Sequence, residues 1–313
     1  MKLSIVIPVY NEEENLKELH KELIVVLDAI KSPYEIIWVN DGSKDGSFTV
    51  LNELVKSDIN SKIIDFARNF GQTAAMSAGI KFATGDIIIP MDADLQNDPR
   101  DIPKFLKKIE EGYDVVSGWR KDRKDKLFLR KIPSWTANLI IAGITAVRIH
   151  DYGCSMKAYR RDVIQGVILY GEMHRFIPAY VSWHGGRVAE IVVNHRARIH
   201  GITKYGISRT FRVILDLILI KFLSKYMNRP IHFFGGVGFV SLALGGITAF
   251  AAFYLRLFHS MAFITTPLPI FSAMLVIVGV QLIAMGVIAE MLMRVYYESQ
   301  GKQPYSIKRT VNT

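Results

Sequence analysis

Two long stretches without a charged residue constrain this chain more than any other feature. Phe233–Leu255 and Met261–Ala289 contain no Asp, Glu, Lys or Arg, and about 20 apolar residues are enough to cross a bilayer once. Pro267 and Pro269 are expected at the start of the second span, because proline disrupts a helix interior. The link between the stretches is short, so the sequence predicts a transmembrane hairpin. Two buried helices of a soluble protein are disfavoured, because so small a chain could hardly cover them.

The basic residues predict the orientation of this hairpin. Three lie within positions 221–229, before the first span, and four lie within 294–309, after the second. The connecting link holds only Arg256 and His259 as basic side chains. Cytoplasmic flanks carry the excess of lysine and arginine in membrane proteins. We therefore expect a multi-pass protein of the inner (plasma) membrane with its main domain and both termini in the cytoplasm.

The rest of the chain is divided by composition. Phe211–Met227 spaces charged residues among apolar ones, which is typical of a helix lying on a membrane surface. The expected segments are a main domain at 1–210, a juxtamembrane amphipathic helix at 211–230, two spans at about 233–255 and 267–291 within 231–293, and a cytoplasmic tail at 294–313. Paired spans can also associate with those of another copy, so a homo-oligomer through the transmembrane part stays open.

The main domain alternates short apolar runs with amphipathic stretches. The expected strands are Leu3–Val9, Tyr34–Val39, Lys62–Phe66, Asp86–Met91 and Asp114–Ser117. The expected helices are Glu13–Ile30, Phe48–Leu54, Thr73–Ala83 and Asp101–Glu111. Alternation of this kind predicts an α/β fold, with a mostly parallel sheet covered by helices on both faces.

Polar clusters follow three of these strands. They are Tyr10–Glu12, Asn40-Asp41 and the run Asp92-Ala93-Asp94-Leu95-Gln96. Ligands of such sheets bind beyond the carboxyl ends of the strands. Two carboxylates one residue apart on a turn can approach one divalent cation, and Mg²⁺ or Mn²⁺ commonly bridges protein carboxylates to substrate phosphates. The sequence therefore predicts a metal and phosphate site at this edge.

Charge and cysteine content narrow the class of partner. The formal net charge of +10 indicates an anionic partner, which could be nucleic acid, acidic lipid or a phosphorylated substrate. The basic residues are scattered and form no recognisable nucleic-acid module, so nucleic acid is not expected. Cys154 is the one cysteine of the chain, which excludes an internal disulfide and a cysteine-based metal cluster.

Three motifs together resemble glycosyltransferase family 2. They are Ile5–Glu12, the Val39–Ser43 turn and the Asp92–Asp94 triplet, which occur in the order and spacing of that family. The chain is most similar to the dolichyl- and undecaprenyl-phosphate glycosyltransferases, over residues 1 to about 210, and the two-span tail fits their bacterial members. The resemblance implies the GT-A fold, which is Rossmann-like, and a nucleotide-sugar as donor.

The same resemblance implies roles for individual residues. The nucleotide pocket would be lined by Pro8, Tyr10, Glu12, Val39, Asp41 and Ala93. The metal would be held by Asp92, Asp94 and Gln96. The acceptor phosphate would meet Arg120, Arg130 and Ser134. Arg198 and Lys204 would bind the donor diphosphate or order a loop over it. The alternative role for Tyr10 and Val39 is packing alone, and the alternative for Arg130 and Arg198 is an ordinary solvated charge.

The implied reaction is metal-dependent transfer of a hexose or related sugar from a nucleotide-sugar to polyprenyl phosphate. The lipid phosphate is already anionic, so placing it with arginine and stabilising the departing diphosphate would suffice. A single displacement would invert the anomeric centre. Asp92, Asp94 and Arg120 are the catalytic candidates, and Asp151 is the candidate if a general base is used, with a turn-capping role as the alternative.

Two other functions stay in view. A processive polysaccharide synthase of the same family is disfavoured, because the chain lacks that group's Gln-x-x-Arg-Trp motif. A non-catalytic membrane protein that binds nucleotide-sugars is disfavoured by the intact Asp92, Asp94 and Gln96. UDP is the favoured nucleotide, but the sequence does not fix UDP against GDP, nor does it name the sugar.

Overall fold

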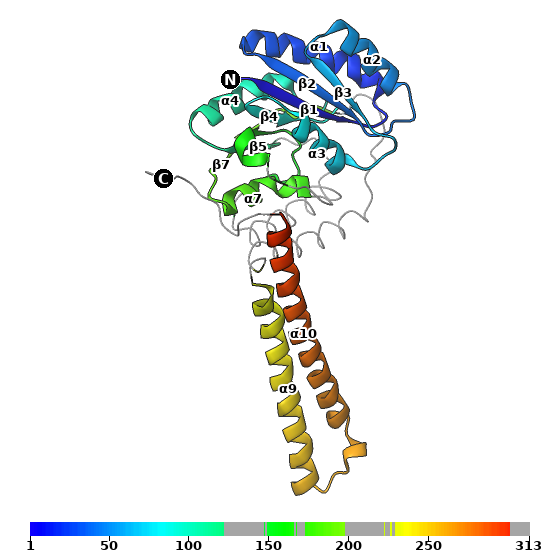
Figure 1. Cartoon of the computed structure of the whole chain (residues 1–313), viewed down its shortest axis with the longest axis vertical. Coiled ribbons are helices and arrows are strands. Elements are labelled where there is room, and N and C mark those ends of the chain that lie inside the picture. Colours follow the sequence, from blue (N-terminus) through cyan, green and yellow to red (C-terminus); the bar gives the residue numbers. More distant parts are fainter. Residues whose placement is uncertain are drawn as a thin grey trace. The chain divides into compact units, whose positions relative to one another are not determined.

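The computed structural model describes residues 1–121, 147, 149–165, 167, 173–197, 222, 226 and 229–300. The chain divides into two compact units, Met1–Ile218 and Leu219–Thr313 (Figure 1). Most of the expected amphipathic helix at 211–230 lies outside the described residues, as do Arg130, Ser134, Arg198 and Lys204.

A mixed sheet forms the centre of the first unit. Its strands are β1 (Leu3–Val9), β2 (Tyr34–Asn40), β3 (Ser61–Asp65), β4 (Ile87–Pro90), β5 (Val115–Trp119), β6 (Lys157–Arg160) and β7 (Val188–Val192). In the part of the chain that the structure describes, they run in the order β3-β2-β1-β4-β6-β5-β7. β1, β2, β3 and β4 are parallel, whereas β6 is antiparallel to both β4 and β5. The carboxyl ends of β1, β2 and β4 therefore meet at one edge.

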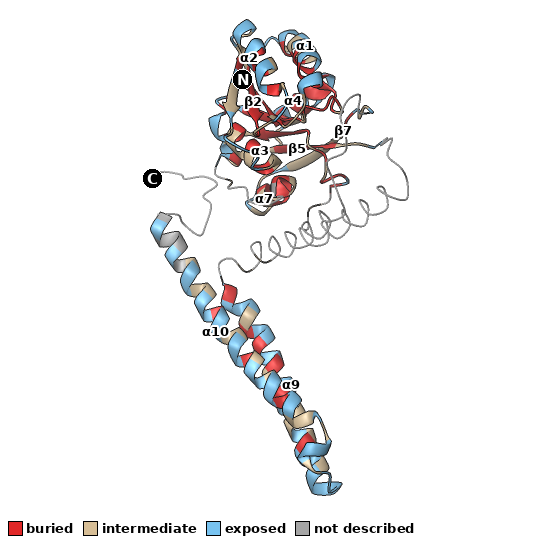
Figure 2. Ribbon diagram, turned by 90° about the vertical axis from the view of Figure 1, so that its right-hand side faces the viewer, coloured by how far each residue is buried: buried red, intermediate tan, exposed pale blue. Residues whose placement is uncertain are grey.

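Helices cover both faces of this sheet. They are α1 (Glu13–Ile30), α2 (Ser47–Ser57), α3 (Gln72–Phe82), α4 (Ile102–Glu110), α6 (Arg161–Ile164) and α7 (Ile177–Trp183), with the short helices η1 (Pro99–Asp101) and η3 (Met173–Phe176). Side chains alternate along a strand, so Ile5 and Ile7 pack with α1, α2 and α4, whereas Val6 packs with α3 and α7. The two cores bury most residues of β1, β2, β4, β5 and β6, whereas the edge strands β3 and β7 are only partly buried (Figure 2).

The expected strands and helices of the main domain are present, with ends that differ by at most three residues. The predicted α/β fold with a mostly parallel sheet is confirmed. The sequence analysis did not anticipate β6 or β7. β6 is a four-residue strand with a basic residue at each end, and β7 is only partly buried, so neither carries the apolar run that marks a buried strand.

The second unit contains two long apolar helices, α9 (Pro230–Phe258) and α10 (Leu268–Gln300). Both are long and apolar enough to cross a membrane, over 230–258 and 268–293. In the most apolar part of each helix, only 22% (α9) and 17% (α10) is buried. The short helix η4 (Phe263–Thr265) lies in the link between them. Pro267 precedes α10 and Pro269 lies in its first turn, as the sequence indicated.

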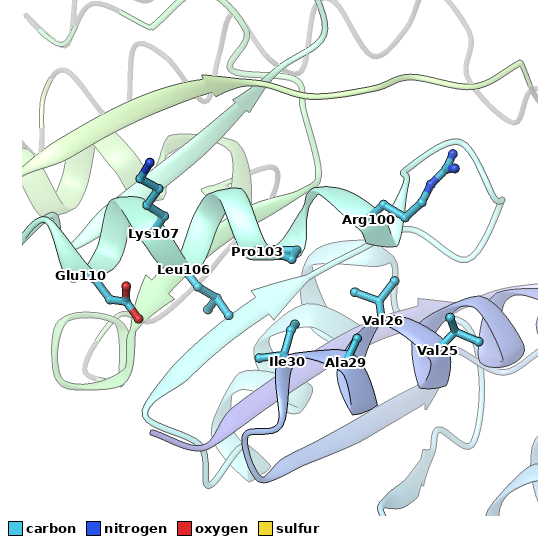
Figure 3. Close-up of a pocket in the computed structure, with 9 residues that line it drawn as sticks. All are labelled: Val25, Val26, Ala29, Ile30, Arg100, Pro103, Leu106, Lys107 and Glu110. Atoms are coloured by element: carbon cyan, nitrogen blue, oxygen red, sulfur yellow. The ribbon is translucent and has the colours of Figure 1, made fainter.

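A shallow groove lies between α1 and α4, on the helix-covered surface (Figure 3). Its volume is about 510 Å³, and its apolar wall includes Val26, Ile30 and Leu106. Arg100, Lys107 and Glu110 lie along its rim. None of the residues that the sequence assigns to a site lines this groove. Those predicted residues that the structure describes lie instead near the carboxyl edge of the sheet.

Candidate functional site

The Asp92–Gln96 turn follows β4 at the carboxyl edge of the sheet. Asp92 accepts a hydrogen bond from Gln72 Nε2 at 2.8 Å, and its backbone N–H donates to Asn97 Oδ1 at 3.1 Å. Asp94 Oδ1 accepts the backbone N–H of Gln96 at 3.2 Å. Leu95 adopts a φ of 59°, a conformation uncommon for a residue with a side chain. The turn is thus held in a tight shape by its own side chains.

The two carboxylates of this turn suit a divalent cation. Burial, and then the nearby charge of Asp94, raise the pKa of Asp92. A divalent cation between the two carboxylates would offset their mutual repulsion and favour the ionised form of both. Among the described residues, no group of three or more His, Cys, Asp or Glu side chains could hold a metal by itself. Two carboxylates and the Gln96 amide would suit Mg²⁺ or Mn²⁺, ions that commonly complete their coordination with substrate phosphates and water.

Asp41, at the end of β2, organises the start of α3. Its carboxylate accepts the backbone N–H groups of Phe70 and Gly71 at 2.7 and 2.9 Å and the amide of Asn69 at 2.9 Å. Burial raises the pKa of Asp41, although the two backbone N–H groups act in the opposite direction. Gly71 has a φ of 94°, which glycine adopts without strain. The next residue is Gln72, so Asp41 also sets the helix turn that reaches Asp92.

The first motif is interlocked with the Asn40–Ser43 turn. The backbone N–H of Asn11 donates to Ser43 Oγ at 3.0 Å, and that of Glu12 donates to Ser47 Oγ at 2.9 Å. Pro8, Tyr10 and Glu12 are each partly buried at this edge. The sheet thus brings the ends of β1, β2 and β4 together, as the sequence predicted from the strand ends.

Two of the hydrophobic candidates are enclosed by protein. Val39 has no exposed surface and packs against α3, and Ala93 is 3% exposed. For Val39, any contact with a nucleotide would come from its backbone. The alternative that its side chain serves packing agrees with this burial.

Arg120 and Asp151 form a buried ion pair. Asp151 accepts from Nε of Arg120 at 2.7 Å and from Nη2 at 3.0 Å, a bidentate pairing. Asp151 is 3% exposed. A Cβ at Gly153 would lie 3.3 Å from Nη2 of Arg120 and 3.5 Å from Nη1 of Arg175, so glycine leaves space beside both guanidinium groups. Although burial acts to lower it, the bond to Asp151 raises the pKa of Arg120. Asp151 is therefore placed to orient Arg120, a role that the sequence analysis did not consider.

Lys157 is a further cation that the sequence analysis missed. Its ammonium group is buried in β6 and donates to the carbonyl oxygens of Tyr152 and Cys154. Burial lowers the pKa of Lys157 to about 8. Ser155 lies on the same segment, and its hydroxyl donates to Asn97 Oδ1 at 3.0 Å. The segment 151–157 therefore joins Arg120 to the turn that carries Asp92 and Asp94.

The comparison with protein families agrees with this arrangement. The family model described as glycosyl transferase family 2 matches residues 4–167, more than half of the chain. The chain belongs to glycosyl transferase family 2. The matched range contains all three motifs, from Ile5 to Asp94, and the expectation of a glycosyltransferase is confirmed.

Curated relatives of this family-2 protein align with nearly its whole length. Dodecaprenyl-phosphate galacturonate synthase from Rhizobium johnstonii is 44% identical over 316 residues, covering 99% of this chain and 93% of the relative. Undecaprenyl-phosphate 4-deoxy-4-formamido-L-arabinose transferase from Pseudomonas fluorescens is 36% identical over 311 residues, covering 99% of this chain and 89% of the relative. The similarity therefore extends through the α9–α10 hairpin.

Solved structures of two sugar-phosphate synthases share the fold over about 70% of the chain. Mannosyl-3-phosphoglycerate synthase from Rubrobacter xylanophilus gives a TM-score of 0.56 at 16% identity, covering 71% of this chain and 74% of that one. Glucosyl-3-phosphoglycerate synthase from Mycobacterium tuberculosis, solved with Mn²⁺, UDP and glucosyl-3-phosphoglycerate, gives 0.55 at 15% identity, covering 70% and 79%. The GT-A fold is confirmed, and the Mn²⁺ and UDP belong to the mycobacterial enzyme.

Proposed function

We propose that this protein transfers a sugar from a nucleotide-diphosphate sugar to polyprenyl phosphate at the cytoplasmic face of the inner membrane, with inversion at the anomeric carbon. One observation carries the proposal. Two relatives named for transfer to polyprenyl phosphates align with 99% of the chain, and so with both the sheet edge and the apolar hairpin. Their names agree on the class of acceptor and differ in the sugar. The acceptor is therefore the firmer part of the proposal.

The donor side would use the ends of β1, β2 and β4. Asp41, Glu12, Tyr10 and Pro8 would line the nucleotide, together with the enclosed Val39 and Ala93. Asp92, Asp94 and Gln96 would hold Mg²⁺ or Mn²⁺, which offsets the charge of the departing diphosphate when bound. Arg198 and Lys204 would bind that diphosphate. We favour UDP as the nucleotide.

The acceptor side would use Arg120, with Arg130 and Ser134 completing the phosphate site. Asp151 occupies the Nε–Nη2 edge of the Arg120 guanidinium, which leaves the opposite edge with Nη1 to meet a phosphate. Arginine binds phosphate with paired, geometrically fixed hydrogen bonds. We infer that Asp151 acts by orienting Arg120, because a lipid phosphate is already anionic and needs no strong base. General-base action by Asp151 is the competing proposal.

The hairpin would keep the enzyme at its lipid substrate. Large apolar side chains of α9 and α10 are exposed, such as Phe250 at 72% and Ile270 at 77%, and an exposed apolar band of this size is stable in lipid. We propose the division given above, with a catalytic domain at 1–210, a juxtamembrane helix at 211–230, spans within 231–293 and a tail at 294–313. Both termini would be cytoplasmic.

The test is sugar transfer by the purified full chain in detergent. It would be incubated with undecaprenyl phosphate and a panel of donors that includes UDP-galacturonate, UDP-4-deoxy-4-formamido-L-arabinose, UDP-glucose and GDP-mannose. A lipid-linked sugar from one UDP donor, lost with chelator and restored by Mn²⁺, is the expected result. If the folded chain binds nucleotide but forms no product with any donor, the proposal fails and a non-catalytic binding role replaces it.

A further inference from the structure

The segment that follows β7 is hydrogen-bonded to the Asp92–Gln96 turn, called the metal turn because it holds the proposed metal ligands. Arg196 and Gln96 are 100 residues apart, yet the backbone N–H of Arg196 donates to the carbonyl oxygen of Gln96 at 3.0 Å. His195 forms an isolated antiparallel bridge with Asn97 in the same place. Asn194 adds two hydrogen bonds, from its backbone N–H to Asp101 at 2.6 Å and from its side chain to Asp98 at 2.9 Å.

Two buried acidic side chains that follow the Asp92–Gln96 turn, Asp98 and Asp101, receive the bonds from Asn194. Asp98 and Asp101 are 2% and 3% exposed, so each requires donors from within the protein. The guanidinium of Arg196 supplies one of them, because its Nη2 lies 2.8 Å from Asp98 Oδ1. Its Nη1 lies 2.7 Å from the carboxylate of Glu22 on α1. Arg196 thus ties the metal turn to α1 as well as to the segment after β7.

The backbone of Arg196 also fixes the side-chain amide of Gln96. Gln96 Nε2 donates to the carbonyl oxygen of Arg196 at 3.4 Å. An amide offers a nitrogen that only donates and an oxygen that can bind a cation. With the nitrogen engaged by Arg196, the oxygen is directed away from that carbonyl. The contact therefore selects the orientation in which Gln96 can serve as an oxygen ligand.

We propose that Arg196 is a positioning residue for the metal site, which acts through Gln96 and the turn and does not touch the substrate. Its ion pairs with Asp98 and Glu22 hold the backbone carbonyl that orients the Gln96 amide. Residues that orient metal ligands commonly change metal affinity when they are removed. This inference rests on the proposed metal site at Asp92, Asp94 and Gln96. It adds a residue, Arg196, that lies outside the three family motifs and would hold that site in place.

The test measures Mn²⁺ binding in the presence of UDP, by the electron paramagnetic resonance signal of free Mn²⁺ with the full chain in detergent. Arg196→Ala is expected to weaken Mn²⁺ binding about 10-fold, and Arg196→Lys to recover part of the loss. If Arg196 acts through Gln96, the double variant Arg196→Ala/Gln96→Ala should bind no more weakly than Gln96→Ala alone. If Arg196 served only to stabilise the fold, the losses of Mn²⁺ affinity in the two single variants would add up in the double variant. That result would overturn the proposal.

Lys17→Ala is the matched control, because it removes an exposed ion pair with Glu53 from the same helix α1. It should bind Mn²⁺ as the wild type does. If Arg196→Ala unfolds, Glu22→Gln removes one of the two ion pairs of Arg196 and is expected to weaken Mn²⁺ binding in the same direction. Unchanged affinity in every folded variant overturns the inference. Equal binding by the wild type and Asp94→Asn removes the metal site itself, and the inference with it.

Discussion

The carboxyl edge of the sheet and the α9–α10 hairpin satisfy their buried polar groups in different ways. At the sheet edge, ionised side chains bond to donors far along the chain, as Asp41 does with residues 69–71 and Asp98 does with Arg196. In the hairpin, serine hydroxyls donate to backbone carbonyls of the facing helix, from Ser241 to Leu275 at 2.7 Å and from Ser272 to Gly245 at 2.8 Å.

The difference follows from what surrounds each region. The proposed site at the sheet edge would place charges for an anionic substrate, and this edge contains charged groups that are costly to leave unpaired. Within a bilayer there is no water to compensate exposed polar groups, and helices associate through small residues and short hydrogen bonds. Charge substitutions should therefore dominate in the first region, and side-chain volume should dominate in the second.

The largest effect is expected from a charge substitution at Asp94, in the turn of the proposed metal site. Asp94→Asn keeps the shape of the side chain and removes its charge, so we expect sugar transfer to fall about 1000-fold, which corresponds to roughly 4 kcal/mol. Turnover of the donor that proves active measures this loss. Asp162→Asn, the same change at an exposed position in α6, should retain full activity. Wild-type activity in Asp94→Asn would remove the turn from the reaction.

The second prediction concerns pH and the buried carboxylate of Glu35. Burial acts to raise its pKa, but hydrogen bonds from Lys62, Ser4 and Thr84 outweigh this and lower the pKa from 4.5 to about 2. A lowered pKa means that Glu35 stabilises the fold fully above pH 4.5 and loses this contribution as the pH falls toward 2. One pKa unit corresponds to about 1.4 kcal/mol, so the contribution near neutral pH is roughly 3 kcal/mol.

Urea unfolding in detergent, followed by tryptophan fluorescence, checks this prediction. Glu35→Gln should be less stable than the wild type at pH 7, and the gap should narrow as the pH is lowered from 5 toward 2. Residues 230–289 of the hairpin contain no Asp or Glu, so the contacts between its two helices should not change between pH 5 and pH 2. A gap that stays constant with pH would contradict the assigned role of Glu35.

The sequence predicted the sheet edge better than it predicted the contacts there. The apolar runs and the polar clusters after them located β1, β2 and β4 and placed Asp41 and Asp92 at one edge, because parallel strands share an end. Asp151 was interpreted as a base or a turn cap, and the structure pairs it with Arg120, 31 residues away. No local pattern encodes such a pairing, since it depends on how β5 and the segment before β6 come together.

Arg196 and Lys157 were missed for the same reason. Arg196 lies among other basic residues in a polar run, which by itself indicates a solvated segment, and its partners Asp98 and Glu22 are distant in sequence. Lys157 is buried in a strand too short and too polar to be predicted. In the hairpin, by contrast, the absence of charge over two stretches was enough to predict both helices, because membrane spans depend on composition more than on particular pairs.

The third prediction tests volume in the hairpin. A Cβ at Gly279 would come within 2.9 Å of the backbone oxygen of Gly238 and 2.7 Å of Leu242, whereas one at Gly246 meets nothing within 4 Å. Gly279→Ala should therefore destabilise helix association by about 2 kcal/mol, and Gly246→Ala should not. Energy transfer between dyes attached at positions 232 and 289, during unfolding by sodium dodecyl sulfate, measures the association. Equal effects of the two substitutions would show that α9 and α10 are not packed through Gly279.

The smallest expected effect separates hydrogen bonding from volume. Ser241→Ala removes the bond to the Leu275 carbonyl on the facing helix, and such bonds between membrane helices contribute about 0.6 kcal/mol on average. Thr248→Val is the control, because its hydroxyl bonds to Leu244 and Gly245 within α9. The same unfolding measurement should show a small loss for Ser241→Ala and none for the control. A loss in Ser241→Ala as large as that in Gly279→Ala would mean that polar bonds dominate both regions and that the contrast between them fails.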